Sequence, residues 1–191
     1  MTKLSENLPI EEARERLRQL IIELAVVRGH VVLASGKEAD YYVDLRRITL
    51  HHEASRLVGQ VMLDLLDKNG IEFEAAGGLT MGADPVGTAI MRAAGDQDRA
   101  IDAFVVRKAQ KSYGMGRQVE GPSVEGRRVV AVEDTSTTGG SALTAVEALR
   151  KAGAEVVAVI VDRATGAKEH VEEVAGVPCL YAYSKDELGL D

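Results

Sequence analysis

The sequence predicts a single α/β domain, in which a mainly parallel sheet is flanked by helices and the N-terminal third forms a small cap, or hood. Two observations favour this fold class. Residues 129–132 and 156–161 are continuously apolar and rich in valine, which is typical of parallel strands that are covered on both faces. In the second part of the chain such runs alternate with segments of helical periodicity, the order expected of a sheet with crossover helices. Residues 1–191 are therefore predicted to be one domain, with residues 1–50 contributing a helix and the cap.

The cap is predicted to begin with an amphipathic helix, because Leu17 and Leu24 belong to an apolar stripe opposite charged residues. Gly29 can end this helix, and Gly70 stands where a left-handed cap would end the next one. In this part of the chain we predict helices over 11–27 and 51–69 and strands over 30–34 and 41–45.

The remaining elements alternate regularly. The predicted strands are short and apolar, the predicted helices carry apolar residues at helical spacing, and Gly153 is placed to end one of the helices. In such sheets ligands bind beyond the carboxyl ends of the strands, so the segments that follow the strands are candidate sites. We predict strands over 73–76, 101–106, 128–132, 156–161 and 178–182, and helices over 84–94, 141–152 and 167–175.

Charge and composition exclude several classes of function. The formal net charge of −7 argues against a general affinity for nucleic acid or for an anionic membrane, and no apolar run is long enough to cross a bilayer. The polar residues 1–12 do not resemble a signal or transit peptide. The single cysteine, Cys179, cannot form an internal disulfide and is expected to be a small buried residue rather than a nucleophile. We therefore expect a cytoplasmic protein.

The most informative segment follows the predicted strand 128–132. Two adjacent carboxylates, Glu133 and Asp134, lead into a loop of hydroxyl and glycine residues and then into a helix. Backbone amides, hydroxyl groups and a helix N-terminus suit a phosphate monoester, and the carboxylates can accept hydrogen bonds from the vicinal hydroxyls of a ribose. A Ser/Thr-rich turn with an N-cap would explain the hydroxyls but not two charges at the end of a buried strand. The loop residues are Thr135, Ser136, Thr137, Thr138, Gly139, Gly140 and Ser141.

This segment resembles the motif with which type I phosphoribosyltransferases bind phosphoribosyl pyrophosphate (PRPP). It lacks the Gly-Lys-[Ser/Thr] ending of a Walker loop, which disfavours ATP hydrolysis. The resemblance implies a type I phosphoribosyltransferase-like fold and PRPP as a substrate. It places Glu133, Asp134 and residues 135–141 in the PRPP site but does not name the base.

A basic stretch follows the predicted strand 101–106. Residues 107–119 carry four cations and no acid in a chain that is acidic overall, and such a loop suits a pyrophosphate that must be covered and then released. A solvated charged loop is the alternative that the charges alone leave open. The order Arg-Lys-x-x-Lys-x-Tyr-Gly resembles the catalytic loop of orotate phosphoribosyltransferases, which often have histidine at the position of Tyr113. The resemblance implies that the PRPP-binding side chains of this loop are Arg107, Lys108, Lys111 and Tyr113.

Further segments resemble the same family. Residues 33–44 are similar to its Leu-Lys-Ser-Gly…Tyr segment, with Ala34 where many relatives have lysine, and residues 77–85 are similar to its pyrophosphate loop, without the lysine of some members. Arg163 matches the family's orotate-binding arginine just past a strand end and can hold a carboxylate in a bidentate pair. The alternative for Tyr41 and Tyr42 is an amphipathic edge strand, and the alternative for Arg163 is a surface salt bridge. The resemblance implies that the orotate-binding residues are Tyr42, Thr137 and Arg163.

The resemblance also implies a reaction. The protein would transfer the ribose 5-phosphate of PRPP to orotate, giving orotidine 5′-phosphate and pyrophosphate in UMP biosynthesis, with Mg²⁺ held mainly by PRPP and water. It would be a homodimer with a shared catalytic loop, because the counterpart of Lys111 reaches the neighbour's site. Catalysis would consist mainly of positioning and charge stabilisation. The implied catalytic residues are Arg107, Lys108, Lys111 and Asp134.

Two alternatives remain open. A phosphoribosyltransferase for another base would share the PRPP loop but would not need Arg163. A non-catalytic regulator of the same fold, which senses PRPP or nucleotide, would be expected to carry a basic face and could lose the basic loop. This chain shows the opposite pattern, because it is acidic overall and keeps the basic loop.

Overall fold

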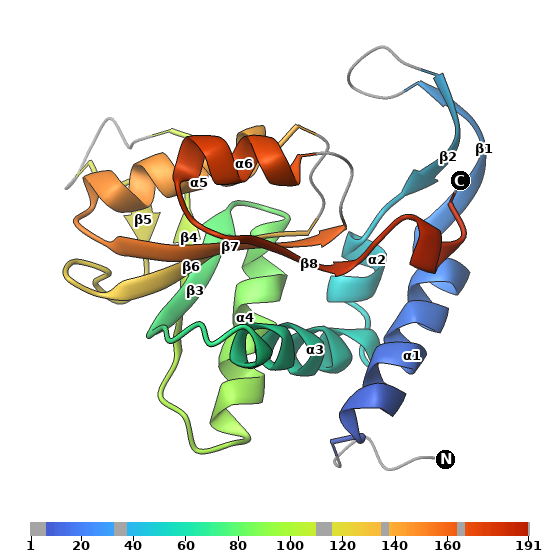
Figure 1. The fold of residues 1–191 in the computed structure, drawn as a ribbon, viewed down its shortest axis with the longest axis horizontal. Helices are drawn as coiled ribbons and strands as arrows, with labels where there is room; N and C mark the ends of the chain where they lie inside the picture. Colours follow the sequence, from blue (N-terminus) through green and yellow to red (C-terminus); the bar gives the residue numbers. More distant parts are fainter. Residues whose placement is uncertain (1–6, 33–37, 110–115, 135–137, 164–166, 191) are drawn as a thin grey trace.

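The structure, a computed structural model of the chain, describes residues 7–32, 38–109, 116–134, 138–163 and 167–190. Its central sheet has six strands (Figure 1): β3 (Ala75–Leu79), β4 (Asp102–Val106), β5 (Val119–Glu120), β6 (Arg128–Glu133), β7 (Glu155–Arg163) and β8 (Cys179–Tyr183). They lie in the order β5–β4–β3–β6–β7–β8. All neighbours pair in parallel except β5, which pairs antiparallel with β4 at one edge.

Helices cover both faces of this sheet (Figure 1), with α3 (Ala54–Lys68) and α4 (Ala83–Gly95) on one face and α5 (Gly140–Lys151) and α6 (Lys168–Ala175) on the other. Successive strand residues point to opposite faces, and both faces of β6 are buried. Val130 and Val132 belong to the core under α3 and α4, whereas Val129 and Ala131 belong to the core under α5 and α6. The predicted fold class is therefore confirmed.

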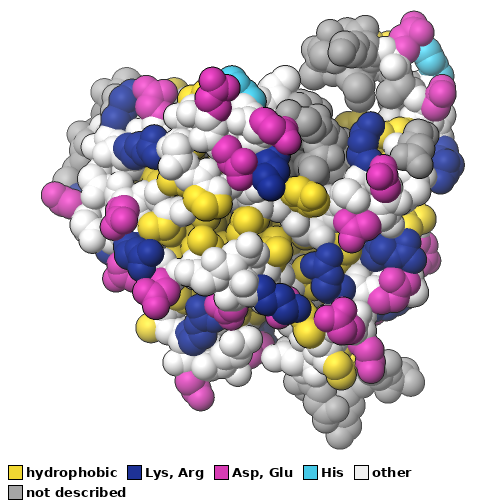
Figure 2. All heavy atoms as spheres, viewed as in Figure 1, with side chains coloured by type: hydrophobic (Ala, Val, Ile, Leu, Met, Phe, Trp, Pro, Cys, Tyr) yellow, Lys and Arg dark blue, Asp and Glu magenta, His cyan; other side chains and the backbone are white. Residues whose placement is uncertain are grey.

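Charges of both signs are mixed on the surface. On the face shown in Figure 2, Lys and Arg side chains lie among Asp and Glu side chains and form no continuous basic area. Such a face offers little attraction for a nucleic-acid backbone. Among the described helices, none combines the length and the apolar character that a membrane span requires.

Strand β3 extends further than the sequence predicted. The predicted strand ended at residue 76, whereas β3 continues through Gly77 and Gly78. A Cβ atom at Gly77 would lie 2.0 Å from the carbonyl oxygen of Phe104, and one at Gly78 would lie 2.0 Å from that of Val132. The glycines therefore allow close packing inside the sheet, where the sequence indicated the start of a loop.

The cap consists of α1 (Ile10–Leu20), a π-helical turn (Ile21–Ala25), the antiparallel strands β1 (Val26–Val32) and β2 (Glu38–Val43), and α2 (Arg46–Thr49). The predicted helix over 11–27 was too long. The β-branched residues Val26 and Val27 pair with β2 instead of continuing the helix, so Gly29 lies inside β1. The second predicted helix likewise begins at Ala54 rather than at residue 51.

In the second part of the chain most element boundaries agree with the prediction within about two residues. The left-handed glycines predicted after two helices are confirmed, with φ of 66° at Gly70 and 82° at Gly153. Strand β7 continues past its predicted end at residue 161 to Arg163, which pairs with Tyr183 of β8. Arg163 is thus the last residue of the strand and does not follow it.

The C-terminal segment joins the cap to the sheet. The hydroxyl of Tyr183, at the end of β8, donates a hydrogen bond to the carbonyl oxygen of Arg14 in α1 at 2.9 Å. In return, Arg14 Nη2 donates to the carbonyl oxygen of Ala182 at 2.9 Å. The hydroxyl of Tyr41 in β2 donates to the carbonyl oxygen of Leu190 at 3.0 Å. These bonds hold α1 and β2 against the end of the chain.

Candidate active site

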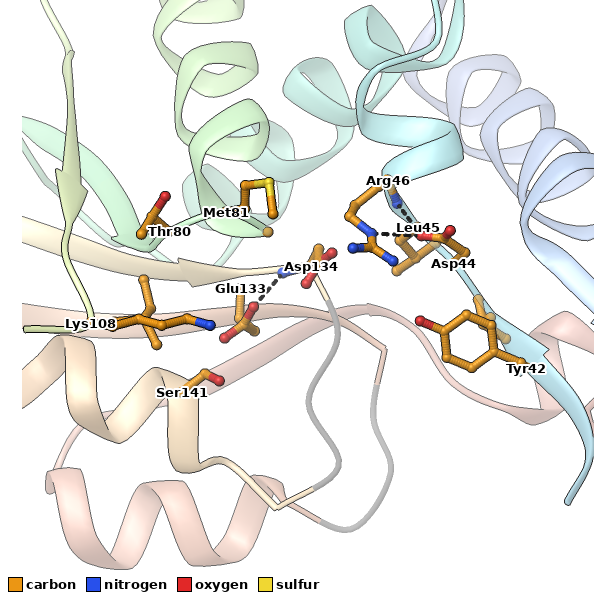
Figure 3. A pocket seen from close by; sticks show the side chains of 13 residues that line it. Tyr42, Asp44, Leu45, Arg46, Thr80, Met81, Lys108, Glu133, Asp134 and Ser141 are labelled. Carbon is orange, nitrogen blue, oxygen red and sulfur yellow. Dashed lines mark hydrogen bonds and ion pairs between the residues drawn. The ribbon is translucent and has the colours of Figure 1, made fainter. Parts of the chain in front are cut away.

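A cleft of about 310 Å³ opens between the cap and the carboxyl ends of β3 and β6 (Figure 3). A parallel sheet is expected to bind ligands at this edge. Side chains from the cap, from the loops after β3 and β4, from the end of β6 and from the start of α5 line it. Those that carry chemistry are Tyr42, Asp44, Arg46, Thr80, Lys108, Glu133, Asp134 and Ser141.

Two buried carboxylates form the floor of the cleft. Glu133 ends β6 and Asp134 follows it, with exposed fractions of 5% and 9%. The backbone N–H of Asp134 donates to Glu133 Oε1 at 3.3 Å. The other oxygen, Glu133 Oε2, is buried and has no hydrogen-bond partner among the described residues. Because such an atom is costly to leave unpaired, this pair suits a ligand that brings hydroxyl groups.

The environment of Glu133 favours its protonated form. Burial is the largest cause that raises the pKa of Glu133 to about 8, and the side chain of Asp134 adds to it through hydrogen bonding and through its charge, whereas the hydrogen bond from the Asp134 backbone N–H acts in the opposite direction. The folded protein therefore keeps this proton to about pH 8, whereas an unfolded chain releases it near 4.5. Between these values the folded state binds more protons, so the free energy of unfolding falls as pH rises.

We expect Glu133→Gln to remove this dependence. The variant should resemble the wild type in stability near the low end of this pH window and should be more stable near its high end, because glutamine mimics the protonated acid without a charge to bury. Urea unfolding at both pH values measures the difference. The exposed Glu155 of β7 offers the control, Glu155→Gln. Equal pH slopes for the wild type and Glu133→Gln would contradict the proposed protonation.

The structure describes the end of the predicted phosphate-binding segment, directly before α5. Gly139 has φ of 80°, and a Cβ atom there would lie 2.4 Å from Cγ2 of Val171, so the position requires glycine. Helix α5 begins at Gly140, and Ser141 in its first turn lines the cleft. The positive end of the helix dipole thus lies near the cleft. Thr138 is exposed, and Thr135, Ser136 and Thr137 lie outside the described residues.

The structure describes two of the four predicted PRPP-binding residues of the basic stretch. Lys108 lines the cleft, and Figure 3 shows its amino group directed toward Glu133. Arg107 instead forms an ion pair with Glu120 of β5, with Nη1 3.7 Å from Oε1. A role for Arg107 at a pyrophosphate stays a prediction and needs the guanidinium to leave this ion pair. Lys111 and Tyr113 lie outside the described residues.

The cap contributes two charged residues that were not predicted as site residues. Arg46 Nε donates to Asp44 Oδ1 at 2.9 Å, and both residues line the cleft beside Tyr42. The hydrogen bond to Asp44 is the main cause that raises the pKa of Arg46 above its usual value. The tyrosine had been predicted, and its side chain is 41% exposed. Opposite charges directly after an amphipathic strand were the available signal in the sequence.

The loop after β3 closes a further side of the cleft. The hydroxyl of Thr80 donates to Asp84 Oδ2 at 2.7 Å, and Asp84 Oδ1 is buried without a hydrogen-bond partner in the described part of the chain. The peptide bond between Thr80 and Met81 is cis. At Gly82 a Cβ atom would lie 2.5 Å from Asp134 Oδ1, so the loop backbone lies directly against the acidic pair. None of residues 80–85 is cationic.

The sequence analysis also made predictions for Arg163 and Cys179. Arg163 ends β7, which pairs with β6 on one side and β8 on the other; its side chain lies outside the described part, and its role stays a prediction. Cys179 is buried, and burial raises the pKa of its thiol to about 11. The predicted burial of Cys179 is confirmed, and the raised pKa disfavours the thiolate, which is the nucleophilic form.

Comparison with known proteins identifies the family. The model of the phosphoribosyl transferase domain matches residues 57–186. The chain is 65% identical over 182 residues to the orotate phosphoribosyltransferase of Streptomyces coelicolor, covering 94% of this chain and 99% of that protein. It is 54% identical over 190 residues to that of Corynebacterium glutamicum, covering 98% and 100%.

A solved structure shows the same fold with a related sequence. The crystal structure of Mycobacterium tuberculosis orotate phosphoribosyltransferase in complex with PRPP has a TM-score of 0.79 and 50% sequence identity. The match covers 93% of this chain and 99% of that one. The family model, the relatives and this structure agree along nearly the whole chain. The protein therefore belongs to the orotate phosphoribosyltransferase family and has the type I phosphoribosyltransferase fold.

Proposed function

We propose that the protein transfers the ribose 5-phosphate of PRPP to orotate, giving orotidine 5′-phosphate and pyrophosphate in UMP biosynthesis. One observation carries this proposal: the acidic pair Glu133 and Asp134, the start of α5 at Ser141 and the cation Lys108 meet in one cleft. A phosphorylated ribose with a leaving pyrophosphate presents the groups that these side chains suit. Family membership supplies the base.

The residues of the cleft suggest how the reaction proceeds. The loop of residues 135–141 binds the 5-phosphate, and the acidic pair holds the ribose hydroxyls. The bond between the anomeric carbon and pyrophosphate breaks with its electron pair going to pyrophosphate, while a ring nitrogen of orotate forms the new bond. Positive charge develops on the ribose and negative charge on the leaving group, so positioning and electrostatic stabilisation supply most of the rate enhancement.

Further side chains are assigned to the two reacting groups. Lys108, together with Arg107, Lys111 and Tyr113 of the same stretch, binds the pyrophosphate. Tyr42 packs on the orotate ring, and Arg163 holds the orotate carboxylate in a bidentate pair. Thr137 contacts orotate from the phosphate loop.

Mg²⁺ fits this cleft as a companion of PRPP. Among the residues that line the cleft, Glu133 has a buried oxygen atom, Oε2, without a hydrogen-bond partner among the described residues, and oxygen atoms are the ligands that Mg²⁺ prefers. In the described part of the chain no group of three or more His, Cys, Asp or Glu side chains forms a metal cage. We therefore propose that PRPP and water hold most of the ion. When bound, it neutralises charge on the pyrophosphate.

We further propose that the protein is a cytoplasmic homodimer in which the loop carrying Lys111 is shared between subunits. The family resemblance of the basic stretch supports the shared loop. The single cysteine supports a reducing compartment. No nucleic acid and no membrane enter the proposed function.

Consumption of orotate in the presence of PRPP and Mg²⁺, followed by absorbance, tests the proposed function. We expect turnover with orotate and none with uracil or with purine bases. Turnover with another base and not with orotate would indicate a phosphoribosyltransferase for that base. PRPP binding without turnover of any base would favour a PRPP-sensing regulator, although that class does not need the basic loop.

We expect Gly82→Ala to weaken PRPP binding while the fold persists. The new methyl group would displace the Asp134 carboxylate, because its carbon would otherwise lie 2.5 Å from Asp134 Oδ1. The displacement would weaken a charge-assisted hydrogen bond worth about 1.5–3 kcal/mol. Calorimetric titration with PRPP and Mg²⁺ measures the loss. Gly95→Ala in α4, where nothing lies within 4 Å of the new Cβ, is the control. Unchanged PRPP affinity of Gly82→Ala would remove Asp134 from the ribose site.

A further inference from the structure

Arg46 lies in the wall of the cleft that the cap provides. It is the first residue of α2, and its side chain is 48% exposed. Figure 3 shows its guanidinium pointing from α2 toward Asp134, on the other side of the acidic pair from Lys108. Of the described residues that line the cleft, these two are the cationic ones.

Asp44 holds the guanidinium in place. Its Oδ1 atom accepts hydrogen bonds from Arg46 Nε at 2.9 Å and from the Arg46 backbone N–H at 3.3 Å. The bond at Nε leaves Nη1 and Nη2 without a hydrogen bond to another described residue. An arginine whose side chain is already ordered loses less conformational freedom when it binds a ligand.

Among the described residues that line the cleft, the acidic side chains outnumber the cationic ones. Three carboxylates line the cleft, Asp44, Glu133 and Asp134, and the adjoining loop of residues 80–85 carries no Lys or Arg. A pyrophosphate brings further negative charge to this region. Lys108 by itself is a point charge, whereas an arginine presents two parallel N–H groups that match two phosphate oxygens.

We propose that Arg46 binds the pyrophosphate group of PRPP from the cap side, opposite Lys108. This inference rests on the proposed function and adds a binding residue to it. The position beside Asp134 favours pyrophosphate over the orotate carboxylate. Asp134 is assigned to the ribose hydroxyls, which neighbour the carbon that carries pyrophosphate. The charge of Asp134 is also among the causes that raise the pKa of Arg46.

A surface ion pair between Arg46 and Asp44 is the competing explanation, and such pairs contribute little to stability. Arg47 provides the matched comparison. It is the next residue, it is exposed, and its Nε lies 4.0 Å from Asp44 Oδ2, but it does not line the cleft. The two arginines are thus adjacent in the sequence, carry the same charge and pair with the same aspartate, but only Arg46 lines the cleft.

Calorimetric titration of Arg46→Ala, Arg46→Lys and Arg47→Ala with pyrophosphate and Mg²⁺ tests the proposal. We expect Arg46→Ala to bind pyrophosphate about tenfold more weakly or worse, as for loss of a charge-assisted pair. Arg46→Lys should recover part of the affinity, because it keeps the charge and loses the fork. Arg47→Ala should bind like the wild type. Orotidine 5′-phosphate, which lacks pyrophosphate, should bind all four proteins with similar affinity.

Wild-type affinity of Arg46→Ala for pyrophosphate would overturn the proposal. So would weakened binding of orotidine 5′-phosphate with unchanged binding of pyrophosphate, which would assign Arg46 to the base. Thermal unfolding verifies that each variant is folded, and Arg46→Gln replaces the alanine variant if that one is not. A wild-type protein that binds pyrophosphate but does not consume orotate would refute the proposed function and leave the role of Arg46 intact.

Discussion

Replacing Lys111 by alanine is expected to lower the turnover number by about a hundredfold or more, as for the loss of a preorganised partner of a developing anion. In the proposed reaction this lysine contacts pyrophosphate, whose negative charge grows as the bond to the ribose breaks. An interaction that is stronger in the transition state than in the ground state affects kcat more than the affinity for PRPP. Steady-state kinetics with direct PRPP titration separates the two effects.

The control is Lys151→Ala, at an exposed lysine in α5 that pairs with Glu147. This variant should keep wild-type kinetics. A Lys111→Ala protein that lost only PRPP affinity, with an unchanged turnover number, would show that Lys111 acts in binding and not in the chemical step.

The proposed sharing of this loop between subunits leads to a further prediction for Lys111. If the lysine acts in the neighbouring subunit's site, a mixture of Lys111→Ala with a variant impaired at Asp134 should form hybrid dimers that contain one intact site. Activity should then rise above that of either variant alone. No recovery after verified subunit exchange would contradict the shared site.

The fold was predictable because its signals are local. The central strands contain continuous apolar runs, as in β6, where residues 129–132 face two cores in alternation. The error in β3 arose because Gly77 and Gly78 are loop formers by local preference. Their place in the strand depends on the backbones of β4 and β6, whose carbonyl oxygens would lie 2.0 Å from a Cβ atom at either glycine. Such contacts depend on residues distant in sequence.

The site residues that lie together in one segment of the chain could be predicted from the sequence, whereas the residues that the cap contributes could not. Glu133, Asp134 and the turn at Gly139 follow one strand, so their order in the chain already indicates their place. Asp44 and Arg46 are far from them in sequence and reach the cleft only because the cap packs against the sheet. The raised pKa of Glu133 could not be predicted from the sequence either, because its main cause is burial.

Arg163→Ala is expected to lower kcat/KM for orotate, with a loss of transition-state stabilisation of about 2–5 kcal/mol, because the proposed ionic partner of the orotate carboxylate is lost. PRPP binding should stay nearly unchanged, since the acidic pair and the phosphate loop are intact. Arg163 ends β7, and its neighbour across the sheet, Tyr183, lies in β8. The backbone of Arg163 therefore lies at the carboxyl end of β7.

The alternative for Arg163 is a salt bridge with Asp162 or Glu169, which would be worth little for activity. Arg163→Lys distinguishes the two explanations. A lysine keeps the charge for a salt bridge but cannot form a bidentate pair with a carboxylate, so it should retain only part of the orotate efficiency. Kinetics with orotate varied, alongside PRPP titration, provides both measurements. Near-normal efficiency of Arg163→Ala with orotate would refute the assignment, and the identity of the base would then have to come from another part of the cleft.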